Sequence, residues 1–144
     1  EYALHRPDYP DQAVAWALAS MLSSGPNGGP VLDGRVLDLG AGTGKLTTAI
    51  LRCGMATTQV LAVEPDDGMR AELRRRLPEI TILNGSAEQI PAEEGAVDVV
   101  LVGQAFHWFD LDRALSETAR VLRPGACWRR WVIPRMTPSA GWPS

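Results

Sequence analysis

Hydrophobic and polar residues are arranged along this chain in blocks that predict strands and helices in alternation. Four short apolar runs have the length of strands, at residues 35–39, 59–63, 80–83 and 97–102. The last run is almost continuously aliphatic, which is typical of a strand buried on both faces. Helices are predicted between and before these runs, at residues 12–22, 45–53, 67–76 and 111–122.

The first predicted helix carries an apolar stripe of Val14, Leu18 and Leu22, and we expect Trp16 to lie in the core as well. A loop rich in Ser, Gly and Pro follows at residues 23–30. Asp66 and Asp110 precede the third and fourth helices and are predicted to cap them.

Alternating strands and helices favour an α/β fold, in which a parallel sheet has helices on both faces. Ligands of such sheets bind beyond the carboxyl ends of the strands. The residues that directly follow each predicted strand are therefore the candidates for chemistry.

A glycine-rich turn follows the first predicted strand and reads Asp-Leu-Gly-Ala-Gly-Thr-Gly-Lys over residues 38–45. A phosphate-binding P-loop is excluded because Leu46 follows Lys45 and Leu39 occupies the first glycine position. A dinucleotide fingerprint needs a third glycine, and Lys45 or Thr47 stands there in the two registers. The turn instead places three alternating glycines after an acid: Asp38, Gly40, Gly42 and Gly44.

Glu64 ends the second predicted strand, twenty residues after Gly44. An acid at this place can accept hydrogen bonds from both hydroxyls of a ribose. NAD enzymes and methyltransferases share this feature, so it predicts a nucleoside ligand without choosing between them.

Three further segments follow in order: Asn-Gly-Ser-Ala-Glu at 84–88, Gln-Ala-Phe-His-Trp-Phe at 104–109 and Arg-Val-Leu-Arg-Pro-Gly at 120–125. Together with VLDLGAGTGKLT and VEPDDGM, they resemble the class I S-adenosylmethionine-dependent methyltransferases of the type-11 group. This group includes quinone-biosynthesis and trans-aconitate-type methyltransferases. The resemblance covers about residues 2–125. It implies a Rossmann-like, doubly wound, mainly parallel sheet and methyl transfer to a small molecule.

The resemblance also implies which residues hold S-adenosylmethionine. The three glycines would line its methionine part, Asp38 would fix the loop, and Glu64 would hold the ribose. The other expected cofactor contacts are Pro65, Asp66, Met69, Ala87 and Glu88 around the adenine, and Gln104 near the methionine carboxylate or sulfonium.

The expected chemistry needs few catalytic groups, because the sulfonium of the cofactor is already an activated leaving group. The protein has to orient an acceptor and exclude water. His107 is the candidate to take a proton from the acceptor, and its alternative role is packing in a pocket wall. Tyr9, on an N-terminal arm, and Trp108 are the expected lid and substrate contacts. No metal site is expected.

Composition limits the possible partners. The 144 residues carry a formal charge of −3, which argues against nucleic acid as a partner. The apolar stretch 13–22 is too short to span a membrane. Cys53 and Cys127 are far apart in the sequence, which suits a reducing cytoplasm and predicts neither a disulfide nor a zinc site.

The pattern changes after residue 125. The family calls for a buried fifth strand, but Arg129 and Arg130 would place one charge on each of its faces. We therefore expect a methyltransferase domain over residues 1–125, with its N-terminal arm and helix at 1–23. Residues 126–144 are expected to be an aberrant tail that does not form the normal fifth strand. Back-translation of residues 126–143 with GC-rich codons permits a family-like hydrophobic sequence in a shifted reading frame, which suggests truncation by a frameshift.

Two alternatives remain beside an active methyltransferase. One is an inactive, truncated fragment or pseudoenzyme that at most binds the cofactor. The other is an NAD-dependent oxidoreductase, which the glycine spacing disfavours. An incomplete sheet would also leave the strand at 97–102 exposed at an edge, which predicts homo-association there.

Overall fold

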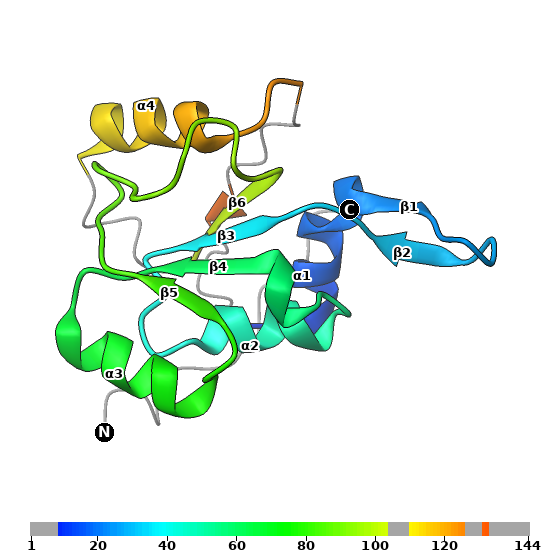
Figure 1. Ribbon diagram of the computed structural model, residues 1–144, viewed down its shortest axis with the longest axis horizontal. Coiled ribbons are helices and arrows are strands. Elements are labelled where there is room, and N and C mark those ends of the chain that lie inside the picture. Colours follow the sequence, from blue (N-terminus) through cyan, green and yellow to red (C-terminus); the bar gives the residue numbers. More distant parts are fainter. Residues whose placement is uncertain (1–8, 104–109, 126–130, 133–144) are drawn as a thin grey trace, which may run out of the picture.

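A five-stranded parallel sheet forms the centre of the protein (Figure 1). The computed structural model describes residues 9–103, 110–125 and 131–132. The strands lie in the order β5-β4-β3-β6-β7, and every neighbouring pair is parallel. Their bounds are β3 Val36–Leu39, β4 Val60–Val63, β5 Thr81–Leu83, β6 Val99–Val102 and β7 Trp131–Val132.

The first strand of this sheet, β3, lies between β4 and β6 and pairs with each over four residues. From β3 the chain proceeds outward to β4 and β5, then returns to the other side of β3 to form β6. The strand order therefore reverses beside β3. In open α/β sheets, ligands bind at the carboxyl end of the sheet next to such a reversal.

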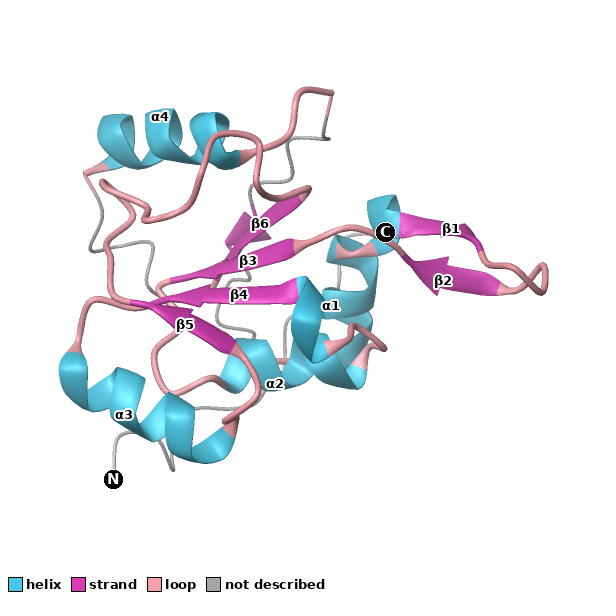
Figure 2. Ribbon diagram, in the orientation of Figure 1, coloured by secondary structure: helices cyan, strands magenta, loops and turns pink. Residues whose placement is uncertain are grey.

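Helices cover both faces of the sheet (Figure 2). α1 (Asp11–Ala17), α2 (Lys45–Arg52) and α3 (Asp67–Arg76) pack on one face, and α4 (Leu111–Val121) packs on the other. Two separate hydrophobic clusters result, one on each face. Val36 belongs to the first cluster and its neighbour Leu37 to the second, because successive strand residues point to opposite faces. The predicted fold class is confirmed.

The predicted caps are also confirmed. The Asp66 carboxylate accepts a hydrogen bond of 2.8 Å from the Met69 amide at the start of α3. Asp110 accepts one of 3.4 Å from the Arg113 amide at the start of α4. α2 ends before Gly54, which has a φ of +108° and so turns the chain out of the helix.

The N-terminal segment differs from the prediction. α1 ends at Ala17, a short 3-10 helix covers Ala19–Met21 (η2), and the chain then forms an antiparallel hairpin instead of a loop. This hairpin pairs β1 (Leu22–Ser24) with β2 (Pro30–Leu32) and projects from the domain in Figure 1. A glycine-rich turn closes it, with the Gly25 amide 2.7 Å from the Gly29 oxygen.

Burial along α1 follows its helical period. Val14 and Leu18 are fully buried, as the stripe predicts, whereas Leu22 is exposed because it lies in the hairpin rather than in the helix. Trp16 is 50% exposed, so its predicted place in the core is wrong. Trp16 stands between Val14 and Ala17 in the sequence, but the helical period turns its side chain away from the buried side of α1.

The outermost strand next to β6 is β7. It pairs with β6 at two positions, Leu101 with Trp131 and Val102 with Val132. The rest of the segment 126–144 lies outside the described residues. The expectations for this tail and for homo-association at this edge therefore stay predictions. Among the described helices, none has the length and apolar character needed to cross a membrane.

Candidate functional site

The glycine-rich turn after β3 depends on a left-handed backbone. Gly40, Gly42 and Gly44 have φ angles of +72°, +60° and +96°, which L side chains adopt only with strain. The turn is tied to the neighbouring strand, because the amides of Gly40 and Ala41 donate to the Val63 oxygen at 2.8 and 3.0 Å. The turn therefore lies across the carboxyl ends of β3 and β4.

Gly42 and Gly44 serve different purposes in this turn. A β-carbon added to Gly44 would overlap the Leu73 side chain, so this glycine permits close packing of the turn on α3. Among the described residues, a β-carbon added to Gly42 would meet only the Met69 sulfur, at 3.9 Å. Gly42 therefore keeps open a space beside Met69, as expected where a ligand approaches the backbone.

Glu64 lies directly after β4 and is only 6% exposed. Its Oε1 accepts a hydrogen bond of 2.9 Å from the Gly42 amide, and its Oε2 accepts one of 2.9 Å from the Asp66 amide. Each carboxylate oxygen has two lone pairs, so both can accept a further hydrogen bond. The carboxylate is thus oriented by backbone amides and still able to hold two hydroxyls.

Asp38 lies within β3 and is buried on the face that α2 covers. Its Oδ2 accepts a hydrogen bond of 2.6 Å from the Thr47 hydroxyl, whereas its Oδ1 accepts none from the described residues. Burial raises the pKa of this carboxyl, the Thr47 hydroxyl lowers it in part, and the negative Glu64 raises it again, to about 7. An unsatisfied buried oxygen favours a ligand that brings a donor or a positive charge.

The residues expected around the adenine come from two strand ends. Pro65, Asp66 and Met69 follow β4 and are exposed. Ala87 is 2% exposed and packs in the core. The Glu88 carboxylate accepts a hydrogen bond of 2.7 Å from the Asp110 amide, which ties its loop to the start of α4.

The structure places Tyr9 at the same edge of the sheet. A β-carbon added to Gly103, directly after β6, would overlap the Tyr9 hydroxyl and lie 3.6 Å from Leu46. The start of the described chain therefore lies close to the carboxyl end of β6, and the lid role of Tyr9 stays a prediction. Gln104, His107 and Trp108 lie outside the described residues, so their roles stay predictions.

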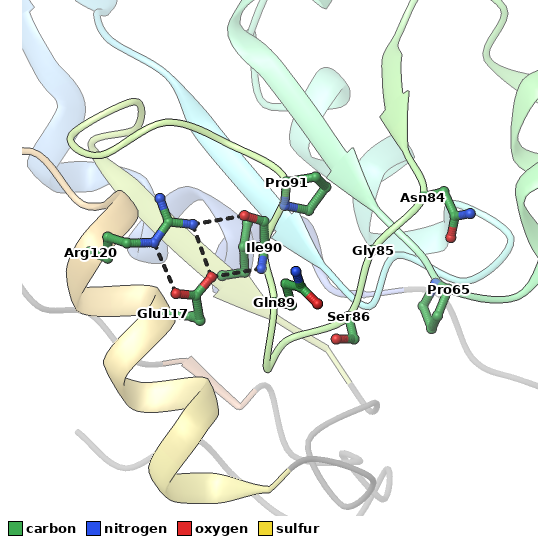
Figure 3. A pocket seen from close by; sticks show the side chains of 9 residues that line it. All are labelled: Pro65, Asn84, Gly85, Ser86, Gln89, Ile90, Pro91, Glu117 and Arg120. Carbon is green, nitrogen blue, oxygen red and sulfur yellow. Dashed lines mark hydrogen bonds and ion pairs between the residues drawn. The ribbon is translucent and has the colours of Figure 1, made fainter.

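A groove of about 720 Å³ adjoins the adenine side of the site (Figure 3). One of its walls is an ion pair on α4, in which Arg120 donates to both oxygens of Glu117 at 2.9 Å. Arg120 also donates to the oxygens of Ile90 and Ala92, and Glu117 accepts from the Ile90 amide, each at 2.8 Å. The lining residues are Pro65, Asn84, Gly85, Ser86, Gln89, Ile90, Pro91, Glu117 and Arg120.

Two residues of the site were missed by the sequence analysis, Thr47 and Arg70. Both are buried polar side chains on helices that face the sheet. Their position in the sequence could have identified them, because each falls on the apolar stripe of its helix, where a polar residue needs a specific partner. Within the described residues, no group of three His, Cys, Asp or Glu side chains could hold a metal ion.

Comparison with known proteins gives a consistent result. Residues 37–127 match the family model described as a methyltransferase domain. An uncharacterized methyltransferase of Mycobacterium tuberculosis is 48% identical over 124 residues, covering 86% of this chain and 45% of that protein. The chain thus spans about half the length of the curated relatives it matches.

Solved structures agree with this match. A putative type II methyltransferase from Anaeromyxobacter dehalogenans is 32% identical with a TM-score of 0.66, covering 84% of this chain and 46% of that one. An S-adenosylmethionine-dependent methyltransferase from Mesorhizobium loti is 26% identical with a TM-score of 0.59, covering 81% of this chain and 51% of that one.

Proposed function

Since the chain belongs to the methyltransferase domain family, whose cofactor is S-adenosylmethionine, we propose that it binds this cofactor across the carboxyl ends of β3, β4 and β5. We further propose that the protein transfers the methyl group to a small-molecule acceptor. The acceptor atom, oxygen, nitrogen or carbon, is left open by the residues of the site.

One observation carries the proposal: the hydrogen bond between the Gly42 amide and Glu64. It joins a backbone that is open to a ligand with a carboxylate that can hold a ribose. Asp38 supports the same ligand, because its unsatisfied oxygen lies at the end of the sheet where the methionine ammonium is expected. Two carboxylates favour the net positive S-adenosylmethionine over NAD, whose pyrophosphate is negative.

The bound cofactor would supply a methyl group on an activated sulfonium. The chain's own residues would then bind, orient and shield. Glu64 and the glycine turn hold the nucleoside and methionine parts, and Tyr9 covers the edge at Gly103. His107 is proposed to take a proton from an acceptor hydroxyl, and Gln104 and Trp108 to contact the cofactor and the acceptor.

The scope of the proposal follows from the comparisons. Because the chain covers 45% of its curated relatives, cofactor binding is proposed for this chain and methyl transfer for the protein as a whole. Binding without turnover is the alternative.

A net charge of −3 supports a small molecule rather than a nucleic acid as acceptor. The widely spaced cysteines support a cytoplasmic location.

Calorimetric titration of the purified chain with S-adenosylhomocysteine and with NAD tests the proposal. We expect saturable binding of S-adenosylhomocysteine, no binding of NAD, and weaker binding of S-adenosylhomocysteine in Glu64→Ala. Glu79→Ala is a matched control, because Glu79 is exposed and remote in the sequence from the turn and from Glu64. Binding of NAD in preference to S-adenosylhomocysteine would overturn the proposal.

A further inference from the structure

Arg70 is a buried arginine in the middle of α3. The residue is 6% exposed and lies on the same face of the helix as the fully buried Leu73. Burying a guanidinium is costly unless its donors find acceptors, so this position requires a specific reason.

The partners of Arg70 come from two adjacent strand ends. Its Nη1 donates to the backbone oxygens of Glu64 and Pro65, at 3.0 and 2.8 Å, directly after β4. The same Nη1 donates to Oδ1 of Asn84, at 3.0 Å, directly after β5. Nη2 pairs with Asp67 on the same helix. One guanidinium therefore ties the end of β4 to the end of β5.

These two strand ends border the space proposed for the adenine. Residues 65–69 follow β4 on one side, and residues 84–88 follow β5 on the other. Figure 3 shows Asn84 and Pro65 on neighbouring segments at one end of the groove. If adenine lies between residues 65–69 and residues 84–88, the distance between these two segments sets whether backbone groups of 84–88 can reach the edge of the adenine.

The segment that begins at Asn84 is compact and fixed at its far end too. A β-carbon added to Gly85 would overlap the Pro91 ring, and Ile90 is held by Glu117 and Arg120. The near end of the segment is tied to β4 in two ways: the Glu64 amide donates to the Leu83 oxygen at 3.1 Å, and Arg70 binds the Asn84 side chain. Arg70 is thus the side-chain contact that fixes the first residue of the segment relative to β4.

We propose that Arg70 is a positioning residue for adenine recognition: it holds the segment 84–88 at the distance from β4 at which the segment's backbone distinguishes adenine from other bases. The inference rests on the proposed function. A planar guanidinium suits the task because its rigid fork reaches several oxygens at once, which a lysine ammonium on a flexible stem does less well.

The test compares S-adenosylhomocysteine with S-inosylhomocysteine, which has an N–H in place of the adenine N1 acceptor. In the proposal, a backbone N–H of residues 84–88 donates a hydrogen bond to adenine N1. Such a donor favours S-adenosylhomocysteine and opposes S-inosylhomocysteine, whose N1 carries a hydrogen. The variants are Arg70→Lys, Arg70→Met and Asn84→Ala. Arg75→Met is the matched control, because Arg75 is on the same helix, is 72% exposed in its side chain and forms an ion pair with Glu72 at the helix surface.

We expect the wild type and Arg75→Met to prefer S-adenosylhomocysteine. In Arg70→Lys and Asn84→Ala, the affinity for this ligand should fall about tenfold, on the scale of one lost polar contact. The affinity for S-inosylhomocysteine should change less, so the preference narrows. Arg70→Met should narrow it further, and if that variant does not fold, the other two decide.

The outcomes separate the inference from the proposed function. Equal losses for both ligands, or an unchanged preference in folded Arg70→Lys and Asn84→Ala, would show that Arg70 only stabilises α3 and would overturn the inference. In that case the wild type still binds S-adenosylhomocysteine. If the wild type binds neither ligand, the proposed function itself fails and the inference with it.

Discussion

The Gly42 amide donates a hydrogen bond of 2.9 Å to Oε1 of Glu64, across 22 residues of sequence. The glycine turn after β3 and the acid after β4 are therefore one structural unit. A change in the turn reorients the carboxylate, and loss of the carboxylate leaves the turn without an acceptor for one of its amides. Binding and local stability are coupled at this point.

Replacing Glu64 should weaken both properties. Glu64→Ala removes the proposed ribose acceptor and leaves the amides of Gly42 and Asp66 without partners. We expect S-adenosylhomocysteine binding to weaken by about 1.5–3 kcal/mol, the usual size of hydrogen bonds to a charged group. Calorimetric titration measures the first effect and urea denaturation the second. Unchanged affinity would mean that Glu64 does not hold the ribose.

The glycines of the turn should separate binding from stability. Gly42→Ala places its β-carbon in open space beside Met69, so it should abolish ligand binding at a cost in unfolding free energy of about 1 kcal/mol from its φ of +60°. Gly44→Ala adds an overlap with Leu73 and should cost about 2–4 kcal/mol.

Urea denaturation and ligand titration of both variants check this contrast. Helical content by circular dichroism should be retained in Gly42→Ala. If Gly42→Ala binds normally while Gly44→Ala does not, the ligand approaches a different part of the turn.

Asp38 should make stability depend on pH. Its carboxyl has a pKa of about 7 in the folded protein and an ordinary value of 3.8 when unfolded. Between these values the folded state holds one more proton at Asp38 than the unfolded state, so the contribution of Asp38 to stability is fully present below pH 4 and is lost as the pH rises to 7. At 1.36 kcal/mol per pKa unit, this contribution is on the order of 4 kcal/mol.

Asp38→Asn provides the test, because the amide mimics the neutral carboxyl and does not titrate. Urea denaturation from pH 4 to 8 measures the unfolding free energy of both proteins. As the pH rises, the wild type should lose stability relative to Asp38→Asn. A difference that is constant across this range would rule out a titration of Asp38.

Ligand binding should release a proton from the same carboxyl. A positive group beside the unsatisfied Oδ1 stabilises the ionised form and lowers the pKa of Asp38 from about 7. The affinity for S-adenosylhomocysteine should then increase from pH 6 to pH 8. Calorimetry in buffers with different ionisation enthalpies counts the released protons, and Asp38→Asn should release none.

The ion pair on α4 should hold the segment around Ile90. Glu117→Ala removes the acceptor of the Ile90 amide and the partner of Arg120. We expect a loss of about 1–2 kcal/mol in unfolding free energy and faster hydrogen exchange at the Ile90 amide. Arg113→Ala is the control, because its side chain is 77% exposed and its ion pair with Asp110 is 3.9 Å long. The control should change stability by less than about 0.5 kcal/mol.

The parts of the fold with local signals were predictable from the sequence. β3, β4, β5 and β6 follow from short aliphatic runs, and the starts of α3 and α4 follow from the caps Asp66 and Asp110. The hairpin of β1 and β2 was not, because its strands are three residues long and are mostly exposed. The end of α1 at Ala17 was not predictable either, because the apolar stripe of the sequence continues to Leu22.

The site shows the same division. Asp38 and Glu64 were identified from their places in the sequence, Asp38 just ahead of the glycines and Glu64 at the end of the next predicted strand. The hydrogen bonds that orient them depend on the tertiary fold, as does the hydroxyl of Thr47. Arg70 was missed because two of its four partners are backbone oxygens, which leave no trace in the residue types at those positions.

The central place of β3 also has a consequence for how the protein assembles. β3, α2, β4, α3 and β5 form one uninterrupted stretch, residues 36–83, that contains Asp38, the glycine turn, Glu64 and Arg70. During synthesis this stretch leaves the ribosome before β6 and α4 emerge, and chains are synthesised at roughly 5–20 residues per second. We therefore expect the part of the site proposed to hold the nucleoside to pair its strands first, before β6 is added beside β3.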